Sequence, residues 1–243
     1  MSSPDPRWSS EAIAKLVTEA GDLREGLSTV AIDALMEKGL IQKFTKGRLI
    51  LEREAEEPKF HMCLSGTVRL TAITEDGREF ISVFMTPGKV WGVHSCLDGT
   101  PETHDSRAET DCEVLGVSAR NLRELMWQNR ELQEAMTEIL CKRLRLALNV
   151  LEQFATWNPR QRLAWRILQI LRSNGGGGGS DSARQSISVS QEAIASMIAL
   201  SRQRTNKLLK EFEQEGFIKI EYGSIRVLDE IGLEAVLEHL PHF

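Results

Sequence analysis

A cluster of basic and amide side chains near the C-terminus carries the residue types that read DNA. Arg202, Gln203, Arg204, Asn206 and Lys207 fall within six consecutive positions. Arg binds guanine through two hydrogen bonds in the major groove, and Gln or Asn pairs with adenine in the same way. Side chains in the first two turns of a helix reach base edges. The cluster therefore predicts a recognition helix for double-stranded DNA.

The residues around this cluster are those needed to hold such a helix. Ser190 is a candidate cap for a short helix over 191–198, and Ser201 for a second helix over 202–213. Two apolar runs after Gly216 predict a β-hairpin wing over 217–227. The turn, the helix caps and the wing all fit a DNA-binding unit. The alternative, that the charged face of the second helix only contacts solvent, is therefore disfavoured. The predicted core is Ile194, Met197, Ile198, Leu200, Leu208, Leu209 and Phe212, and the DNA-contacting set adds Ser190, Gln191 and Ser201 to the cluster.

Charge is distributed unevenly along the chain. The 243 residues carry a formal net charge of −5, which is unusual for a nucleic-acid binder. Between Asn158 and Lys210, however, nine basic residues face only two acidic ones, Asp181 and Glu192. A local basic surface can neutralise phosphates while the remaining acidic surface repels nonspecific contacts. We therefore expect the second half of the chain to bind DNA.

The elements before this unit change character along the chain. Helical spacing over 11–40 is followed by short strand-like runs over 41–117, separated by turn signals such as Asp76-Gly77, a candidate hairpin. Strands at this spacing predict an antiparallel sandwich or barrel. Asn158-Pro159 then begins another helix, which ends before the glycine run 175–179. We expect that run to form a loop inside the second domain.

A helical region over 118–156, capped by Ser118, carries an apolar stripe with spacings of three or four residues. Such a stripe predicts a two-fold coiled-coil dimer seam. The alternative is that it packs on the β domain of its own chain. Leu146, Leu148 and Val150 lie outside the stripe and would let the helix face both. The predicted seam is Met136, Leu140, Leu144, Ala147, Leu151 and Phe154.

Several other classes of protein are disfavoured. The sequence has no His-x-His pair, no Gly-x-Ser-x-Gly elbow and no phosphate-gripping Gly-x-x-x-x-Gly-Lys loop, so neither an enzyme nor a metal site is expected. The four cysteines have no Cys-x-x-Cys spacing and are expected to be reduced and mostly buried, with redox sensing as the alternative. Without an apolar span or signal-like N-terminus, a cytoplasmic protein is expected.

Over residues 20–230 the chain resembles the cyclic-AMP-receptor/fumarate-nitrate-regulator family of bacterial transcription factors. Segments 64–70, 76–79 and 87–92 are similar to its β-roll, 107–114 to the strand after its phosphate-binding cassette, and 200–210 to its recognition helix. The resemblance implies an α+β fold with an N-terminal β-roll, a long central dimerisation helix and a C-terminal winged helix-turn-helix. The domains would cover 1–117, 118–157 and 158–243.

The resemblance also implies a mode of action. A homodimer would bind a near-palindromic site whose half-sites lie roughly 34–36 Å apart, and RNA polymerase would be its protein partner. By position, Arg202 would contact a guanine, Gln203 a neighbouring base and Lys207 a base or phosphate. The family commonly has Glu where this chain has Gln203. Because Glu accepts from cytosine and Gln pairs with adenine, an altered half-site is expected.

The resemblance does not extend to the residues that hold cyclic AMP. The family's Glu falls on Lys89, its phosphate-binding Arg on Glu102, followed by Thr103, and its helix hydroxyls on Ala147 and Leu148. A carboxylate repels a phosphate, so cyclic AMP is not expected as the effector and no cofactor is assigned. The candidate effector pocket is Lys89, Trp91, Glu102, Thr103, Arg107, Leu144 and Leu148.

Other effectors remain open. An iron–sulfur sensor would need the N-terminal cysteine cluster of the oxygen-sensing members, which is missing. Haem would need an axial ligand, for which His61, His94 and His104 are candidates. Trp91, Leu144 and Leu148 would make the pocket more apolar than a nucleotide site. A different nucleotide, an apolar metabolite or no ligand at all are the remaining possibilities.

Overall fold

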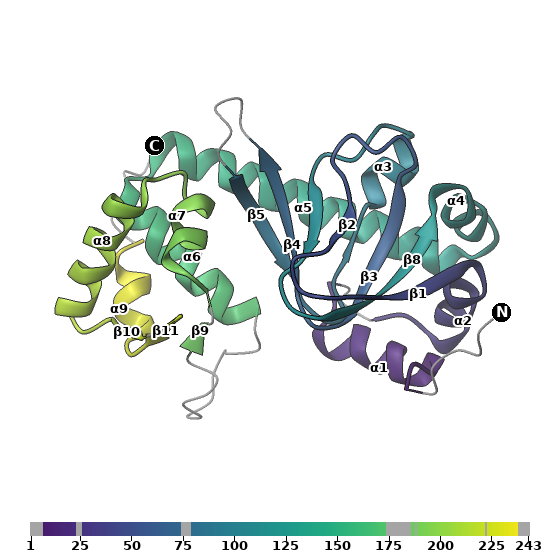
Figure 1. The fold of residues 1–243 in the computed structure, drawn as a ribbon, viewed down its shortest axis with the longest axis horizontal. Coiled ribbons are helices and arrows are strands. Elements are labelled where there is room, and N and C mark those ends of the chain that lie inside the picture. Colours follow the sequence, from purple (N-terminus) through teal and green to yellow (C-terminus); the bar gives the residue numbers. More distant parts are fainter. Residues whose placement is uncertain are drawn as a thin grey trace. The chain divides into compact units, whose positions relative to one another are not determined.

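The N-terminal half of the chain folds around two antiparallel sheets (Figure 1). The computed structural model describes residues 7–22, 26–73, 79–173, 186–187, 189–221 and 223–237. The predicted Asp76-Gly77 hairpin and the glycine run 175–179 lie outside these ranges. Two compact units are present: residues 1–78 with 82–146, and residues 79–81 with 147–243.

The two sheets of the first unit have four strands each. In spatial order, one consists of β1 (Gly39–Phe44), β8 (Cys112–Ser118), β3 (Lys59–Ser65) and β6 (Val90–Trp91). The other consists of β2 (Leu49–Leu51), β7 (Asp105–Ala108), β4 (Val68–Ile73) and β5 (Glu79–Met85).

Strand β3 shows why these residues form a central strand. Its side chains from Phe60 to Leu64 are all buried, because successive residues point to opposite faces and both faces are covered. Phe60 and Met62 belong to the core beneath the helices, whereas Cys63 belongs to a second core with Val68 and Trp91 between the sheets. The predicted antiparallel sandwich is thus confirmed.

Five helices accompany these sheets in the described residues: α1 (Ser10–Ala20), α2 (Thr29–Lys38), α3 (Val93–Asp98), α4 (Ala119–Gln128) and α5 (Arg130–Thr156). Ser118 caps α4 as predicted, its hydroxyl accepting from the Asn121 N–H. The helical region expected over 118–156 is nevertheless two helices. Asn129 ends α4 through its backbone N–H and begins α5 by accepting from Leu132 at 3.2 Å.

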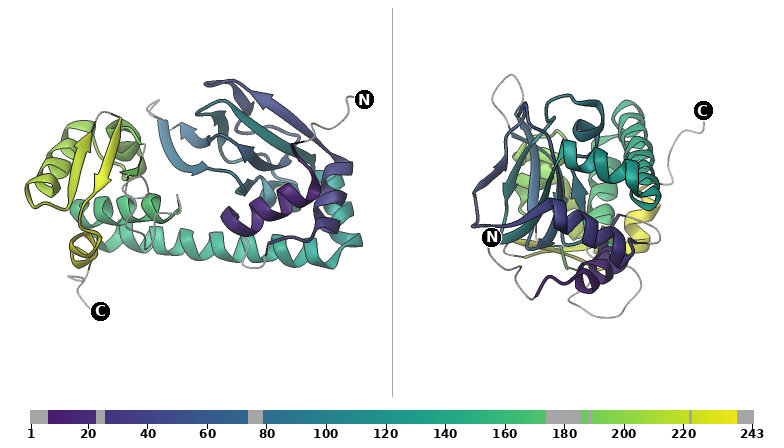
Figure 2. Two further views of the ribbon diagram at one scale, coloured as in Figure 1. Left: turned by 90° about the horizontal axis from the view of Figure 1, so that it is seen from below. Right: turned by 90° about the vertical axis from the view of Figure 1, so that its right-hand side faces the viewer.

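The second unit contains the predicted helix-turn-helix and wing. After α6 (Pro159–Ser173) and β9 (Ser186–Ile187) come α7 (Gln191–Met197), α8 (Arg202–Gln214), β10 (Ile218–Glu221), β11 (Ser224–Val227) and α9 (Glu230–Ala235). Strands β10 and β11 pair antiparallel, with Ile218 opposite Val227. The helices and this hairpin are seen side by side in Figure 2. The α+β fold class is confirmed.

Short polar contacts fix the ends of these helices. The side chain of Asn158 accepts from the Arg160 and Gln161 N–H groups, which starts α6. Ser190 and Ser201 cap α7 and α8, as their sequence contexts predict. Between the two helices Ala199 adopts a left-handed conformation, with φ at 53°. This conformation, unusual for a residue with a Cβ, produces the tight turn that orients α8.

Candidate DNA interface and effector region

Helix α8 divides its residues between a buried face and an exposed one. Thr205, Leu209 and Phe212 are fully buried. The predicted base-reading residues Arg202, Gln203, Arg204 and Lys207 are all exposed. The Ser201 hydroxyl accepts from the Arg204 N–H, which fixes the first turn of the helix. The fold therefore presents four of the predicted DNA-contacting side chains on one solvent-facing surface.

The other predicted contacts differ in their surroundings. Asn206 is half-buried, and its Oδ1 lies buried without a hydrogen-bond partner among the described residues. Its carbonyl oxygen is therefore turned toward the protein. At the start of α7, Ser190 is exposed and its hydroxyl accepts from the Ala193 N–H at 3.1 Å, while Gln191 is half-buried.

The cations of this unit fall into two groups. Arg160 forms ion pairs with Glu211 and Glu215, and Arg172 forms ion pairs with Glu230 and Glu234. Within the described ranges, Arg202, Arg204 and Lys207 have no ion pair. The count of basic residues between Asn158 and Lys210 therefore overstates the positive charge of the folded surface. Four carboxylates that follow Lys210 in the sequence neutralise two of the counted arginines.

A buried arginine that the sequence did not single out supports the helix-turn-helix. Arg166 on α6 is 8% exposed and donates to the Met197 carbonyl at the end of α7, at 3.3 Å. It also donates to Gln169 and lies over the Trp165 ring. Burial lowers the pKa of Arg166 to about 10, so it remains charged at neutral pH. Its charge belongs to the protein interior and is not available to DNA.

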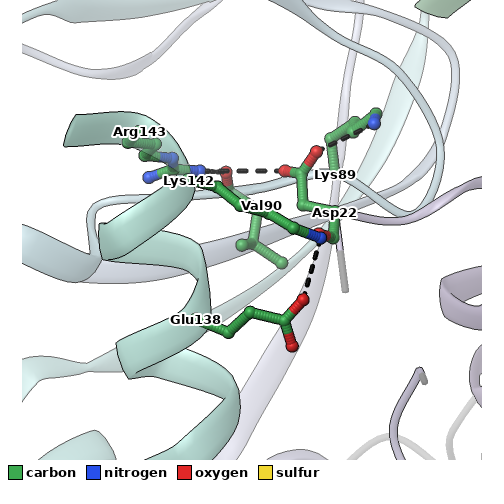
Figure 3. Close-up of polar contacts among 6 residues, drawn as sticks. All are labelled: Asp22, Lys89, Val90, Glu138, Lys142 and Arg143. Carbon is green, nitrogen blue, oxygen red and sulfur yellow. Dashed lines mark hydrogen bonds and ion pairs between the residues drawn. The ribbon is translucent and has the colours of Figure 1, made fainter. Parts of the chain in front are cut away.

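In the first unit, Lys89 lies in a cluster of ion pairs. Lys89 Nζ lies 2.8 Å from Asp22 Oδ1, and the side chain is largely covered (Figure 3). Asp22 follows α1, so Lys89 is directed toward the N-terminal helices. Its assignment to a pocket with Glu102 and Thr103 stays a prediction.

Asp22 joins three elements in the same cluster (Figure 3). Arg143 on α5 donates to the Val90 carbonyl at the start of β6, and its guanidinium lies 3.9 Å from Asp22 Oδ2. Lys142 donates to the Asp22 carbonyl and forms an ion pair with Glu138 at 2.9 Å. The cluster therefore ties α5 to the end of α1 and to the strand that enters α3.

Glu102 is buried in the loop that follows α3. It is 5% exposed and lies beside Gly92, where an added Cβ would stand 3.2 Å from Oε1 and 2.0 Å from the Lys59 carbonyl. Burial raises the pKa of Glu102, although hydrogen bonds from Ser95 and from the Lys59 backbone oppose this effect. A carboxyl group, and no cation, thus occupies this position.

The remaining predicted pocket residues differ in their surroundings. Trp91 is buried between the sheets and stacks on His61 at 5.0 Å, whereas the Thr103 hydroxyl is exposed and bonds to His94 and His104. Arg107 points to the opposite face of β7 from Ala108, which belongs to the inter-sheet core. The inclusion of Arg107 in the pocket stays a prediction.

The apolar stripe of α5 has a buried part and an exposed part. Met136 is 1% exposed and packs in the core of its own unit, with Leu140 half-buried beside it. Met136 is therefore not a seam residue, as the alternative reading of the stripe foresaw. Leu144, Leu148 and Leu151 are 62%, 56% and 68% exposed, so Leu144 and Leu148 line no enclosed pocket in the protomer. Ala147 is exposed as well, and the side chain of Phe154 lies outside the described residues.

A groove in the first unit was not foreseen. It measures about 350 Å³ and is lined by Leu97, Arg123, Met126, Trp127 and Gln133, with Trp127 92% exposed. Where the structure describes the chain, no three His, Cys, Asp or Glu side chains are arranged to hold a metal ion. Nor do the described ranges contain a helix long and apolar enough to cross a membrane.

The cysteines are placed largely as expected. Cys63, Cys96 and Cys112 are buried and Cys141 is exposed, and all four are free thiols. Burial raises the pKa of Cys63 and that of Cys96 to about 12. These two thiols are therefore inert at neutral pH, because the thiolate is the reactive form.

Two family models match the chain. The model of the cyclic nucleotide-binding domain matches residues 41–129, and that of the Crp-like helix-turn-helix domain matches residues 161–236. Together they cover more than half of the sequence and correspond to the two sheets with α3 and α4, and to the unit that carries α8.

Curated relatives extend the similarity over most of the chain. A CRP-like cAMP-activated global transcriptional regulator of Mycobacterium tuberculosis is 26% identical, with 88% of this chain and 95% of the relative aligned. The transcriptional regulator SdrP of Thermus thermophilus is 24% identical, with 80% of this chain and 93% of the relative aligned. Among solved structures, FixK2 from Bradyrhizobium japonicum has a TM-score of 0.71 at 17% identity, covering 82% of this chain and 96% of that one.

Proposed function

The chain belongs to the cyclic-AMP-receptor/fumarate-nitrate-regulator family of DNA-binding transcription regulators, and on this premise we propose that it reads a near-palindromic site as a homodimer without requiring cyclic AMP. The family's members are not enzymes. DNA as the target places its action in the cytoplasm, and RNA polymerase is the protein whose activity it would alter.

The observation that carries the DNA-binding proposal is the exposed surface of α8. Arg202, Arg204 and Lys207 present positive charges that no described carboxylate neutralises, while Arg160 and Arg172 elsewhere in the unit are ion-paired. Gln203 lies between the two arginines and is exposed. Arg would read guanine and Gln adenine, so this short segment supplies both charge and sequence preference.

The homodimer proposal is supported by α5. Leu144, Ala147, Leu148 and Leu151 repeat at intervals of three or four residues and are all exposed in the protomer. Apolar residues at this spacing pack against the same stripe on a second helix. A two-fold dimer presents two copies of α8, and a near-palindromic site matches that symmetry.

Independence from cyclic AMP is supported by Glu102 and by α5. The family resemblance puts the phosphate-binding Arg at Glu102, where the carboxyl group is buried, and the base-binding hydroxyls at Ala147 and Leu148, which have none. A nucleotide here would meet a carboxyl in place of its counter-ion. The relative from Mycobacterium tuberculosis is described as cAMP-activated, so this chain would differ from it in its effector.

The test is a binding titration on palindromic DNA selected from a random pool, with and without cyclic AMP. We expect one affinity in both conditions, and a loss of roughly 1–3 kcal/mol per half-site when Arg202 is replaced by Ala. Lys210→Ala, on the same helix but beyond its first two turns, is the matched control. Binding that appears only with cyclic AMP would refute nucleotide independence, and an unchanged affinity of the Arg202→Ala variant would refute the recognition surface.

A further inference from the structure

The groove of the first unit is lined by residues of α3, α4 and the first turn of α5. Leu97 and Met126 are partly buried against the core and supply its apolar lining. Trp127 borders the same groove with 92% of its surface exposed. Indole rings combine a large apolar body with a polar N–H group, which is why tryptophan is enriched where proteins bind each other. The groove therefore has the surface chemistry of a protein-binding site.

The charged residue that lines the groove is a cation. Arg123 on α4 donates to the Cys96 carbonyl of α3 at 2.7 Å, which holds its guanidinium at the groove. In the part of the chain that the structure describes, Arg123 forms no ion pair. Arg120 is exposed one turn earlier on the same face of α4 and likewise has no ion pair with a described residue. Two guanidinium groups without a carboxylate partner thus stand beside the apolar surface.

The carboxylates that neighbour the groove in the sequence are bound by other groups of the first unit. Their partners are Thr100 for Asp98, Lys38 for Glu124, Ser28 for Glu131 and Arg130 for Glu134. Glu124 and Glu131 are thereby directed toward α2, whereas Arg123 is directed toward α3. The groove consequently presents positive charge to a partner, and a complementary partner carries negative charge.

We propose that this groove docks an acidic peptide segment of another protein. An apolar side chain of the peptide packs on Trp127 and Met126, and its carboxylates bind the two neighbouring guanidinium groups. Trp and Arg are the residues that most often dominate the energy of protein interfaces. The unbranched Met side chain adapts its shape to what it contacts. The inference does not depend on DNA recognition, because every residue that it uses lies in the first unit.

A peptide fits this groove better than a small molecule does. Small-molecule sites enclose most of the surface of their ligand. Trp127, which borders the groove, is itself almost fully exposed and cannot enclose a ligand. A peptide extends beyond the groove and covers the indole from outside, and its backbone and flanking carboxylates reach Arg120 and Arg123. The volume of about 350 Å³ then needs to hold only the apolar anchor of the peptide.

The experiment selects binders from a random peptide library displayed on phage, using the full-length wild-type protein as bait. The selected peptides should combine Asp or Glu with a Leu, Phe or Trp anchor. A fluorescein-labelled copy of the strongest binder is then titrated with each protein variant by fluorescence anisotropy. Its affinity should fall as salt is added, because exposed charges are screened.

Two substitutions test the groove itself. Trp127→Ala should lower the affinity of the selected peptide at least about tenfold, as truncation of a central interface tryptophan does. Ile231→Ala, which is 78% exposed in the second unit, is the matched control and should bind as wild type does. Arg120→Glu should weaken the acidic peptide and strengthen a copy of it in which Lys replaces Asp and Glu. Arg48→Glu, exposed before β2, controls for the reversed charge.

Several outcomes would overturn the proposal. Selected peptides without acidic residues, or a selection that enriches no peptide, would show that the groove has no such preference. Equal affinity of Trp127→Ala and wild type would place the peptide elsewhere. Displacement of the peptide by a short oligothymidine strand would identify a nucleic-acid surface instead. Self-association that Trp127→Ala abolishes, measured by analytical ultracentrifugation, would show that a second copy of the chain covers the groove.

Discussion

Glu102 is the residue whose surroundings most restrict what the effector region can bind. Its carboxyl group is buried beside Gly92, Ser95 and Lys59, and one oxygen has no hydrogen-bond partner among the described residues. An oxygen in that state requires a donor, such as a hydroxyl or an amine, and repels a phosphate. A ligand of this region would thus be neutral or cationic at the end that meets Glu102.

Burial at Glu102 has a consequence for stability that depends on pH. Because burial raises its pKa above the usual 4.5, the folded state binds this proton more tightly than the unfolded chain does. Its contribution to stability is therefore present at low pH and lost as pH rises from 4.5 through the raised pKa. Glu102→Gln keeps the hydrogen-bond acceptor and removes the charge, so the variant should gain stability over wild type as pH rises from 4 to 7. Urea unfolding across that range measures the difference.

A surface carboxylate provides the control for this prediction. Glu57 is exposed in the loop before β3, and Glu57→Gln should follow the wild-type pH profile. Parallel profiles for Glu102→Gln and wild type would show that the Glu102 carboxyl is charged in the folded protein at no energetic cost. The position would then be solvated, contrary to its burial.

Among the elements, α5 combines two kinds of surface. Its first half is buried in its own unit through Leu132, Met136 and Ile139, and its second half exposes Leu144 and Leu151. Substitutions in the two halves should consequently have different effects. Leu151→Asp should convert the dimer to a monomer with little change in the stability of the protomer, because it places a charge in the proposed seam. Analytical ultracentrifugation reports the oligomeric state.

Met136→Ala is the paired substitution. It should leave the dimer intact and lower the free energy of unfolding by about 2–5 kcal/mol, the usual cost of removing a buried Met side chain. Asn149→Asp, exposed on α5, controls for the added charge of Leu151→Asp. A Leu151→Asp variant that stays dimeric would show that the exposed stripe is not the seam.

The Asp22 cluster makes a prediction at the same scale. Asp22→Asn removes the partner of Lys89 and Arg143, two partly buried cations that join α1, β6 and α5. We expect a loss of roughly 1–3 kcal/mol, between the values for exposed and buried ion pairs, measured by urea unfolding. Glu134→Gln removes the exposed ion pair with Arg130 at the start of α5 and should cost less than about 0.5 kcal/mol. If the two variants lost the same free energy of unfolding, the Asp22 cluster would contribute no more to stability than an exposed ion pair does.

The elements also show which features a sequence can predict. Ser118, Ser190, Ser201 and Asn158 were identified as caps because capping depends on residues within one turn. The division of the α5 stripe, the partners of Arg160 and the direction of Lys89 were missed. Each depends on what the fold brings from distant positions, such as Asp22 opposite Lys89, and spacing along the chain carries no signal for it.

At the scale of the whole molecule, the reactivity of the thiols measures how completely the fold shields its interior from solvent. Burial protects Cys63, Cys96 and Cys112, whereas Cys141 on α5 is exposed. Reaction with a thiol reagent under native conditions should therefore modify one cysteine per chain, and all four should react after unfolding. Cys141→Ser should abolish the native reaction. A native protein that reacts at more than one site would reveal openings of the sheets on the time scale of labelling.

The net charge of the whole chain affects how the protein encounters DNA. The chain has 35 acidic and 30 basic residues, yet the exposed start of α8 is basic. Acidic surfaces elsewhere repel a duplex, so favourable encounters are restricted to those that present α8. The sequence alone indicated this asymmetry, although it could not show that Arg160 and Arg172 would be neutralised by their own unit.

The anchoring of α5 bears finally on how a dimer would assemble. Starting a helix in water is unfavourable because several residues must be ordered before the first hydrogen bond forms, and a segment of 13 residues is marginal by itself. In α5 the residues up to Arg143 are held by their own unit, so the turns from Leu144 to Thr156 extend a nucleus that already exists. Each protomer would enter the encounter with its seam already helical. Association would then proceed without coupled folding, as the docking of two preformed rods.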